Sequence, residues 1–144
     1  MRVPLPAVLA CLLLIPAARG AAPPLTVTDA WVRAAPGSDV AAAYMTLRND
    51  GRAVLRIVGV HSSLAAQAMI HETRLENGRS IMRAHEPLEV APGQSVHLAP
   101  GGLHVMLHGL AHPLAVGEQV PLELLLEGGA RVALSARVRP LNAE

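Results

Sequence analysis

Two histidines and two methionines in this chain have the residue types and the spacing of a metal site. His71, Met82, His104 and Met106 are separated by ten, twenty-one and one residues. The thioether sulfur of Met is a soft, neutral ligand, and among biological metals this softness favours Cu(I). Imidazole binds many metals, so the histidines alone would not distinguish between them. Together, the four residues predict a copper-binding protein.

The expected strands place these residues in two pairs. His104 and Met106 belong to an extended segment in which successive side chains alternate between faces, so they point the same way, roughly 7 Å apart. His71 and Met82 flank the turn residues Asn77-Gly78, and a hairpin there would bring them close across two strands. That the two pairs converge on one ion is a hypothesis.

The remaining histidines and methionines have simpler interpretations. A lone Met in a β protein usually fills space in the core, which we expect for Met45 and Met69. Met69 shares a face with His71, however, and would be the first substitute ligand. The other five histidines are expected to be surface or hydrogen-bonded residues, namely His61, His85, His97, His108 and His112. His108 shares a strand face with His104 and Met106, so a peripheral role at the site remains open for it.

Short apolar-alternating segments separated by turn residues recur from Leu25 onward, which predicts an all-β sandwich or barrel. The expected strands are 25–33, 41–48, 54–61, 67–72, 80–83, 95–98, 103–108, 120–126 and 131–138. Residues 62–68 could form a helical turn. The core must be aliphatic, because Phe is absent and Trp31 and Tyr44 are the only aromatic residues. We expect both aromatic side chains to pack in that core.

The first twenty residues have the order of a secretory signal peptide: a basic start at Arg2, an apolar run, and small residues at the end. The apolar run is shorter than the ~20 residues of a membrane-spanning helix. With cleavage after Gly20 or Ala22, we expect the mature chain, residues 21–144 in the first case, to be a single domain with no membrane span. The apolar run continues past Cys11, so we do not expect lipidation there.

Charge and cysteine content exclude several functions. Without residues 1–20, ten arginines face eleven acidic residues, and a nucleic-acid partner would need a basic patch. Cys11 is the only cysteine and would leave with the signal peptide. The mature chain could then form no disulfide, no blue-copper centre, which needs a Cys thiolate, and no catalytic Cys–His pair. We find no other catalytic constellation and predict that the protein is not an enzyme.

The spacing His71-x10-Met82-x21-His104-x-Met106 is similar to that of the PCuAC family, the periplasmic copper chaperones of CuA assembly. All four ligand positions match without a gap. Further similar blocks cover most of the mature chain, namely 29–33, 42–47, 70–73, 100–107 and 113–117. Some members carry a His- and Met-rich C-terminal tail with a second copper site, which we do not expect here because the chain ends Arg-Pro-Leu-Asn-Ala-Glu.

The resemblance implies a Greek-key β-sandwich of cupredoxin-like character that binds one Cu(I) through His71, Met82, His104 and Met106. It also implies a monomer in the periplasm that delivers copper to the CuA site of a respiratory cytochrome oxidase. The partners would be the copper subunit of that oxidase, a Sco-type thiol protein, or both.

Three alternatives remain open at this point. The protein could be a periplasmic copper buffer or resistance protein that uses the same site. It could be a β-sandwich interaction module in which the His and Met residues are structural. A hydrolytic zinc enzyme ranks last, because zinc sites draw on His, Cys and carboxylates rather than on Met.

Overall fold

The computed structural model describes residues 20–142, and this part of the chain contains ten β-strands and no helix. The strands are β1 (Leu25–Ala34), β2 (Val40–Asn49), β3 (Leu55–His61), β4 (Ala65–Glu76), β5 (Arg79–Ala84), β6 (Leu88–Val90), β7 (Ser95–Leu98), β8 (Leu103–Leu110), β9 (Gln119–Leu126) and β10 (Arg131–Arg139). Nine of them were predicted from the sequence, with bounds that differ by a few residues. The all-β, cupredoxin-like sandwich predicted from the sequence is confirmed.

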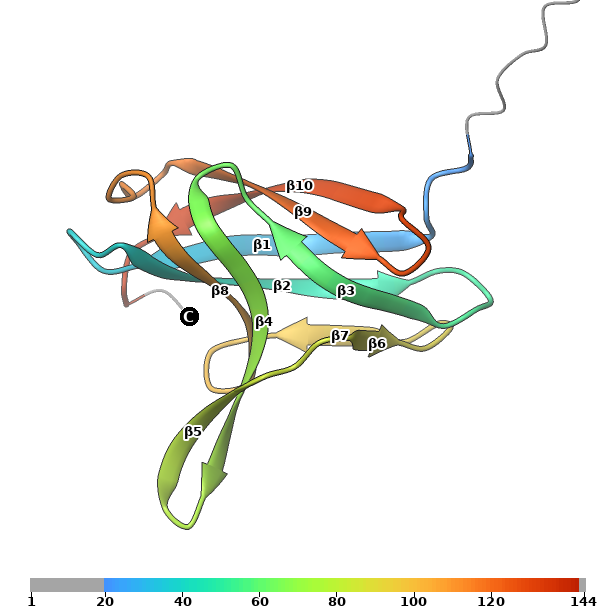
Figure 1. Cartoon of the computed structure of the whole chain (residues 1–144), viewed down its shortest axis with the longest axis horizontal. Helices are drawn as coiled ribbons and strands as arrows, with labels where there is room; N and C mark the ends of the chain where they lie inside the picture. Colours follow the sequence, from blue (N-terminus) through green and yellow to red (C-terminus); the bar gives the residue numbers. More distant parts are fainter. Residues whose placement is uncertain (1–19, 143–144) are drawn as a thin grey trace, which may run out of the picture.

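The strands form one hydrogen-bonded sheet in the order β5-β4-β8-β2-β1-β10-β9-β3-β6, which folds over to enclose the core (Figure 1). Strand β2 has two neighbours on the same side. Its first half pairs with β8 and its second half, from Met45 to Arg48, pairs with β7. All of these pairs are antiparallel except β1 with β10. The arrangement puts β4, β8 and β2 side by side, although β2 and β4 are far from β8 in sequence.

The core is aliphatic, as the absence of Phe requires. Side chains of alternate residues point inward, so Ile70 of β4 and Val105 of β8 are fully buried and belong to one apolar cluster with residues from the other strands. Met45 is 2% exposed and lies in this cluster, as predicted. The residues next to Ile70 and Val105 in sequence must therefore lie on the opposite, outer face of the sheet.

The β4–β5 hairpin extends away from the rest of the sandwich (Figure 1). Its turn contains Asn77 and Gly78, both with positive φ, at 51° and 75°. Two consecutive residues of this kind match the right-handed twist of the strands that they join. The predicted hairpin is thus confirmed. Ion pairs along it, Arg83 to Glu76 at 3.2 Å and Arg74 to Glu72 at 2.7 Å, involve partly exposed side chains.

Two details of the strand assignment differ from the sequence prediction. The short strand β6 was missed, because three residues are too few to show a periodic pattern. It pairs with β3, and the fully buried amide of Asn49 donates hydrogen bonds to the carbonyls of Ala53 and Val90, which ties β6 to the end of β2. The helical turn expected at 62–68 was wrong, since residues from Ala65 onward already belong to β4.

Trp31 and Tyr44 are buried, as expected, but they pack outside the aliphatic core cluster. A register shift in the β1–β2 pairing between Thr28 and Trp31, where Asp29 has a φ of 53°, marks a β-bulge. One extra residue reverses which face the following side chains occupy. Trp31 therefore lies on the outer face, directly opposite Tyr44.

The predicted signal peptide, including Cys11, lies outside the described residues apart from Gly20. Among residues 20–142, no helix has the length and apolar character that crossing a membrane requires.

We predict that Ile70→Ala lowers the free energy of unfolding by about 2–5 kcal/mol, because it leaves a cavity in the core directly behind the outer-face residues of β4. Urea denaturation followed by circular dichroism measures this. Leu75→Ala on the same strand, where the side chain is 78% exposed, is the control and should stay within about 0.5 kcal/mol of the original protein. Equal effects of the two substitutions would contradict the placement of β4 over the core.

Candidate metal centre

The pairing of β4 with β8 brings two of the predicted ligands face to face. His71 lies directly opposite His104 in the antiparallel register. Their ring centroids are 6.0 Å apart and the ring planes meet at 83°. Because metal–nitrogen bonds are about 2 Å long, one ion can bind between two rings at this separation after small side-chain rotations. The sequence predicted both residues but did not reveal that they are direct cross-strand neighbours.

The two predicted methionine ligands share this outer face but lie on opposite sides of the histidine pair. Met106 is two residues beyond His104 on β8, where it is half-buried. Met82 lies on β5 opposite Thr73, which makes it a diagonal rather than a direct neighbour of His71. The Met82 side chain is 49% exposed. The structure therefore places His71, His104 and Met106 in one compact group and Met82 at its exposed border.

The backbone just before β8 orients the ring of His104. It is 4% exposed, and its Nδ1 lies 3.0 Å from the carbonyl oxygen of Gly102. A carbonyl can only accept a hydrogen bond, so Nδ1 carries the proton and donates it. The lone pair is then on Nε2. A backbone carbonyl that fixes the tautomer in this way is the usual partner of a metal-binding histidine.

His71 presents a different signal. Its Nδ1 is buried and has no hydrogen-bond partner. Burial away from water, together with repulsion from His104 and His108, lowers the pKa of His71, and attraction by Glu86 opposes this only in part. The imidazole is therefore neutral near pH 7, the form that can bind a metal. A buried nitrogen with no partner is costly unless something binds it.

Met69 and His108 continue the same strip of side chains. Met69 lies directly opposite Met106, and His108 lies opposite Gln67, which is the next pair on the same face. Met69 is half-buried and does not belong to the core cluster, so the expectation that it packs in the core was wrong. The alternation of side chains along a β-strand could have predicted this position, because Met69 is two residues from His71 and next to the buried Ile70.

Three of the other histidines make hydrogen bonds elsewhere, as expected. His85 Nδ1 lies 3.2 Å from the Glu72 carboxylate, His97 Nδ1 lies 3.1 Å from the Thr46 hydroxyl, and His112 Nε2 lies 2.6 Å from Glu118. The exposed His61 is at the end of β3, away from β4 and β8 in the sheet order.

An aromatic pair borders the histidines on the β2 side. The ring of Tyr44 is 6.5 Å from that of His104 and 4.6 Å from that of Trp31. The guanidinium of Arg33 lies 5.6 Å from the Tyr44 ring centre, and that of Arg139 lies 5.1 Å from the Trp31 ring centre. Of these side chains, Tyr44 is the one next to His104, and this contact follows from the pairing of β2 with β8. The contact of Trp31 with Tyr44 follows from the bulge in β1, and the sequence analysis missed it.

The chemistry of the group is that of a soft, neutral donor set. In residues 20–142, no three His, Cys, Asp or Glu side chains gather where they could hold a metal ion. The two imidazoles on β4 and β8 therefore need thioether sulfur to complete a coordination sphere. No donor in this set carries a negative charge. Neutral nitrogen and sulfur donors suit a singly charged soft cation better than a hard divalent one.

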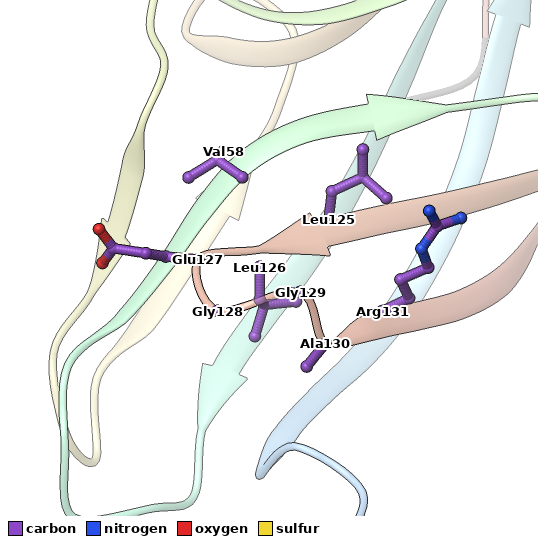
Figure 2. A pocket seen from close by; sticks show the side chains of 8 residues that line it. All are labelled: Val58, Leu125, Leu126, Glu127, Gly128, Gly129, Ala130 and Arg131. Carbon is purple, nitrogen blue, oxygen red and sulfur yellow. The ribbon is translucent and has the colours of Figure 1, made fainter.

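A separate pocket of about 430 Å³ lies at the turn between β9 and β10 (Figure 2). It is lined by Val58, residues 125–130 and Arg131. None of these residues belongs to β4, β5 or β8, and none has metal-binding character beyond the single carboxylate of Glu127. The pocket is not part of the candidate metal centre.

Comparison with known proteins agrees with this geometry. The family described as "Putative lipoprotein LpqE-like" matches residues 25–138. The chain belongs to the LpqE-like family. A relative of this LpqE-like chain, "Putative lipoprotein Lxx21020" of Leifsonia xyli subsp. xyli (strain CTCB07), is 36% identical over 117 residues, which cover 81% of this chain and 70% of the relative.

Solved structures similar to this LpqE-like chain include PCuAC domains, so the resemblance to that family is confirmed. The Cu(I) form of DR1885 from Deinococcus radiodurans is 36% identical with a TM-score of 0.68, covering 88% of this chain and 85% of that one. The copper-bound PCuAC domain from PmoF2 is 25% identical with a TM-score of 0.69, covering 83% and 96%.

We predict that the apo protein loses stability on acidification and that part of this loss comes from His71. In the unfolded chain its pKa is about 6.5, whereas the folded value is lower. Between the two values the unfolded state binds the extra proton, so the free energy of unfolding falls as the pH falls through this window. Urea unfolding at about pH 7.5 and about pH 5 should show a smaller loss in His71→Gln than in the original protein. Equal losses would contradict the desolvated, neutral state of His71.

Proposed function

We propose that this chain is a periplasmic copper chaperone, which binds one Cu(I) through His71, Met82, His104 and Met106. The observation that carries the proposal is the direct opposition of His71 and His104 on a sheet face that also carries both methionines. The copper-bound and Cu(I) forms of the similar PCuAC domains support it. Cu(I) is the cargo of such a protein, and the chain's activity is binding and release rather than catalysis.

The donor set suits a carrier. Cu(I) has a filled d shell and imposes little geometry, so two nitrogens and two sulfurs in a distorted tetrahedron satisfy it. A thioether needs no deprotonation and binds more weakly than a thiolate. A partner with thiolate ligands can therefore take the ion, while weaker ligands in the surroundings cannot. Protonation of an imidazole competes with metal binding, so the Cu(I) affinity falls as the pH falls.

Delivery to the CuA site of a respiratory cytochrome oxidase is the proposed use of the cargo, with the oxidase copper subunit or a Sco-type thiol protein as recipient. The family resemblance supports a CuA-assembly role, and the release chemistry above is compatible with a thiolate recipient. Export through a cleaved signal peptide in residues 1–20 is part of the same proposal. The description of the family and of a relative as putative lipoproteins supports export.

We predict that the protein takes up one tightly bound equivalent of Cu(I) in an anaerobic titration against a coloured chelator. Met82→Leu and Met106→Leu should each lower the affinity at least about tenfold, which corresponds to about 1.4 kcal/mol, because each removes one sulfur donor. The double variant should lose tight binding altogether. Oxidation of either Met to the sulfoxide should act in the same direction, since it replaces a soft donor with a hard one.

Met45→Leu is the matched control for this titration, because Met45 is a buried core residue away from the donor group. A Met-to-Leu change keeps the apolar volume and is usually tolerated. The control should bind Cu(I) like the original protein. If the original protein takes up no Cu(I), the residues are structural and the chain is better described as an interaction module. If both single variants bind unchanged, the four-ligand assignment is wrong.

The physiological role is tested separately, in a strain that lacks the gene. A delivery protein predicts loss of oxidase activity at low copper and recovery when copper is added, because the recipient can then load without a carrier. A copper buffer or resistance protein predicts normal oxidase activity and sensitivity at high copper. The second pattern would replace delivery by storage and leave the metal site itself unaffected.

A further inference from the structure

The β4–β8 ladder carries a third methionine in contact range of the proposed site. Met69 lies directly opposite Met106, which makes them the next pair on the same face after His71 and His104. Directly opposite residues of an antiparallel pair have Cβ atoms about 4.5–5.5 Å apart. Residues two apart on one strand share a face and lie roughly 7 Å apart. His71, His104, Met69 and Met106 therefore form a four-cornered group of two imidazoles and two thioethers.

The surroundings of Met69 are those of the site rather than of the core. The neighbouring residue Ile70 is fully buried and points into the aliphatic cluster, so Met69 occupies the outer face with His71. Met69 is half-buried. Met45, in contrast, is 2% exposed and belongs to the core. Of the two methionines without a role in the four-ligand set in residues 20–142, Met45 is used for packing and Met69 is not.

Met82 is less well placed than Met69 to meet Met106. Its partner Thr73 is four residues from Met69 on β4, and β5 is separated from β8 by β4. In a flat sheet this offset is roughly 13 Å along the strands and roughly 10 Å across them. Twisting of the hairpin and long Met side chains must shorten it for both sulfurs to bind one ion. Met69 needs no such movement.

Resting on the proposed function, we propose that Met69 is a third thioether ligand of the Cu(I) centre, which replaces Met82 when that exposed ligand leaves. The exchange breaks one copper–sulfur bond, to Met82, and forms another, to Met69. The copper stays Cu(I), and no proton or electron is transferred. The ion thus stays on the β4–β8 pair, bound less tightly than with Met82, while the side from which Met82 has left is open to a thiolate of the recipient.

The direct test is nuclear magnetic resonance of the full chain labelled with ¹³C at the methionine methyl groups, with Cu(I) added under anaerobic conditions. Coordination shifts the methyl resonance next to the bound sulfur. The Met82→Leu variant populates the state in which Met69 must bind. There we expect the Met69 and Met106 resonances to shift and the core Met45 resonance to stay, because Met45 cannot reach the ion. A Met69 resonance that stays with that of Met45 would overturn the proposal.

Chelator competition with a double-mutant cycle gives a second readout. If Met69 substitutes for Met82, Met69→Leu should lower the Cu(I) affinity at least about tenfold more in the Met82→Leu background than in the original protein. Equal effects in the two backgrounds would overturn substitution of one for the other. Met45→Leu in both backgrounds controls for general loss of packing.

The two proposals fail in different ways. If Cu(I) shifts no methionine resonance and is not taken up, the copper-binding function is wrong, and the role of Met69 fails with it. If Met106 shifts in the Met82→Leu variant and Met82 and Met106 shift in the original protein, while Met69 never does, only the role of Met69 is wrong.

Discussion

The register of β4 on β8 is the constraint on which the candidate metal centre depends. The pairing runs from Ala65 opposite Leu110 to Glu72 opposite Leu103 without a shift. A slip of β4 by one residue would turn His71 into the core, away from His104, and bring Ile70 to the outer face. Ile70 and Val105 are fully buried and directly opposite each other. Burial of these two apolar side chains therefore stabilises the register that keeps His71 opposite His104.

The same geometry explains why the donors are neutral. A sheet face only one residue removed from an aliphatic core, and bordered by the Trp31–Tyr44 pair, is a poor place for an ionised side chain. Burial lowers the pKa of His71, so the imidazole sheds its proton and keeps a lone pair. The Gly102 carbonyl fixes the tautomer of His104 without adding charge. Neutral donors reduce the cost of burying the site before any metal arrives.

Alternation and turn chemistry were sufficient to predict the all-β class, nine of the ten strands and the shared face of His104 and Met106. They were insufficient wherever a single residue changed the alternation. The bulge at Asp29 moved Trp31 to the outer face, and the sequence carries no strong sign of a positive φ at that position. Core packing was likewise expected for Met69, although Met69 and Ile70 cannot face the same side of one strand. Applying the alternation from Ile70 would have corrected this.

Which strands become neighbours could not be read from the residues, because cross-strand partners far apart in sequence depend on the whole sheet. The direct opposition of His71 and His104 is of this kind, whereas the local hairpin at Asn77-Gly78 was predictable from its turn alone. The ligand spacing identified the family before any strand order was available. Spacing therefore gave the residue types and positions of the proposed donors but not their mutual geometry.

Exposure along the outer face increases from His104 to Met82, the border at which the proposed site would release its ion. His104 is 4% exposed and lies next to the aromatic pair, whereas Met82 is 49% exposed on an edge strand whose hairpin extends beyond the sandwich. A ligand on a projecting hairpin has fewer packed neighbours to hold it than ligands between paired strands, so its bond to a metal is the one that local motion opens first. A site with all donors buried would bind more tightly but would shield the ion from an acceptor. In the proposed centre, one thioether at the solvent border would allow firm binding and exchange at the same site.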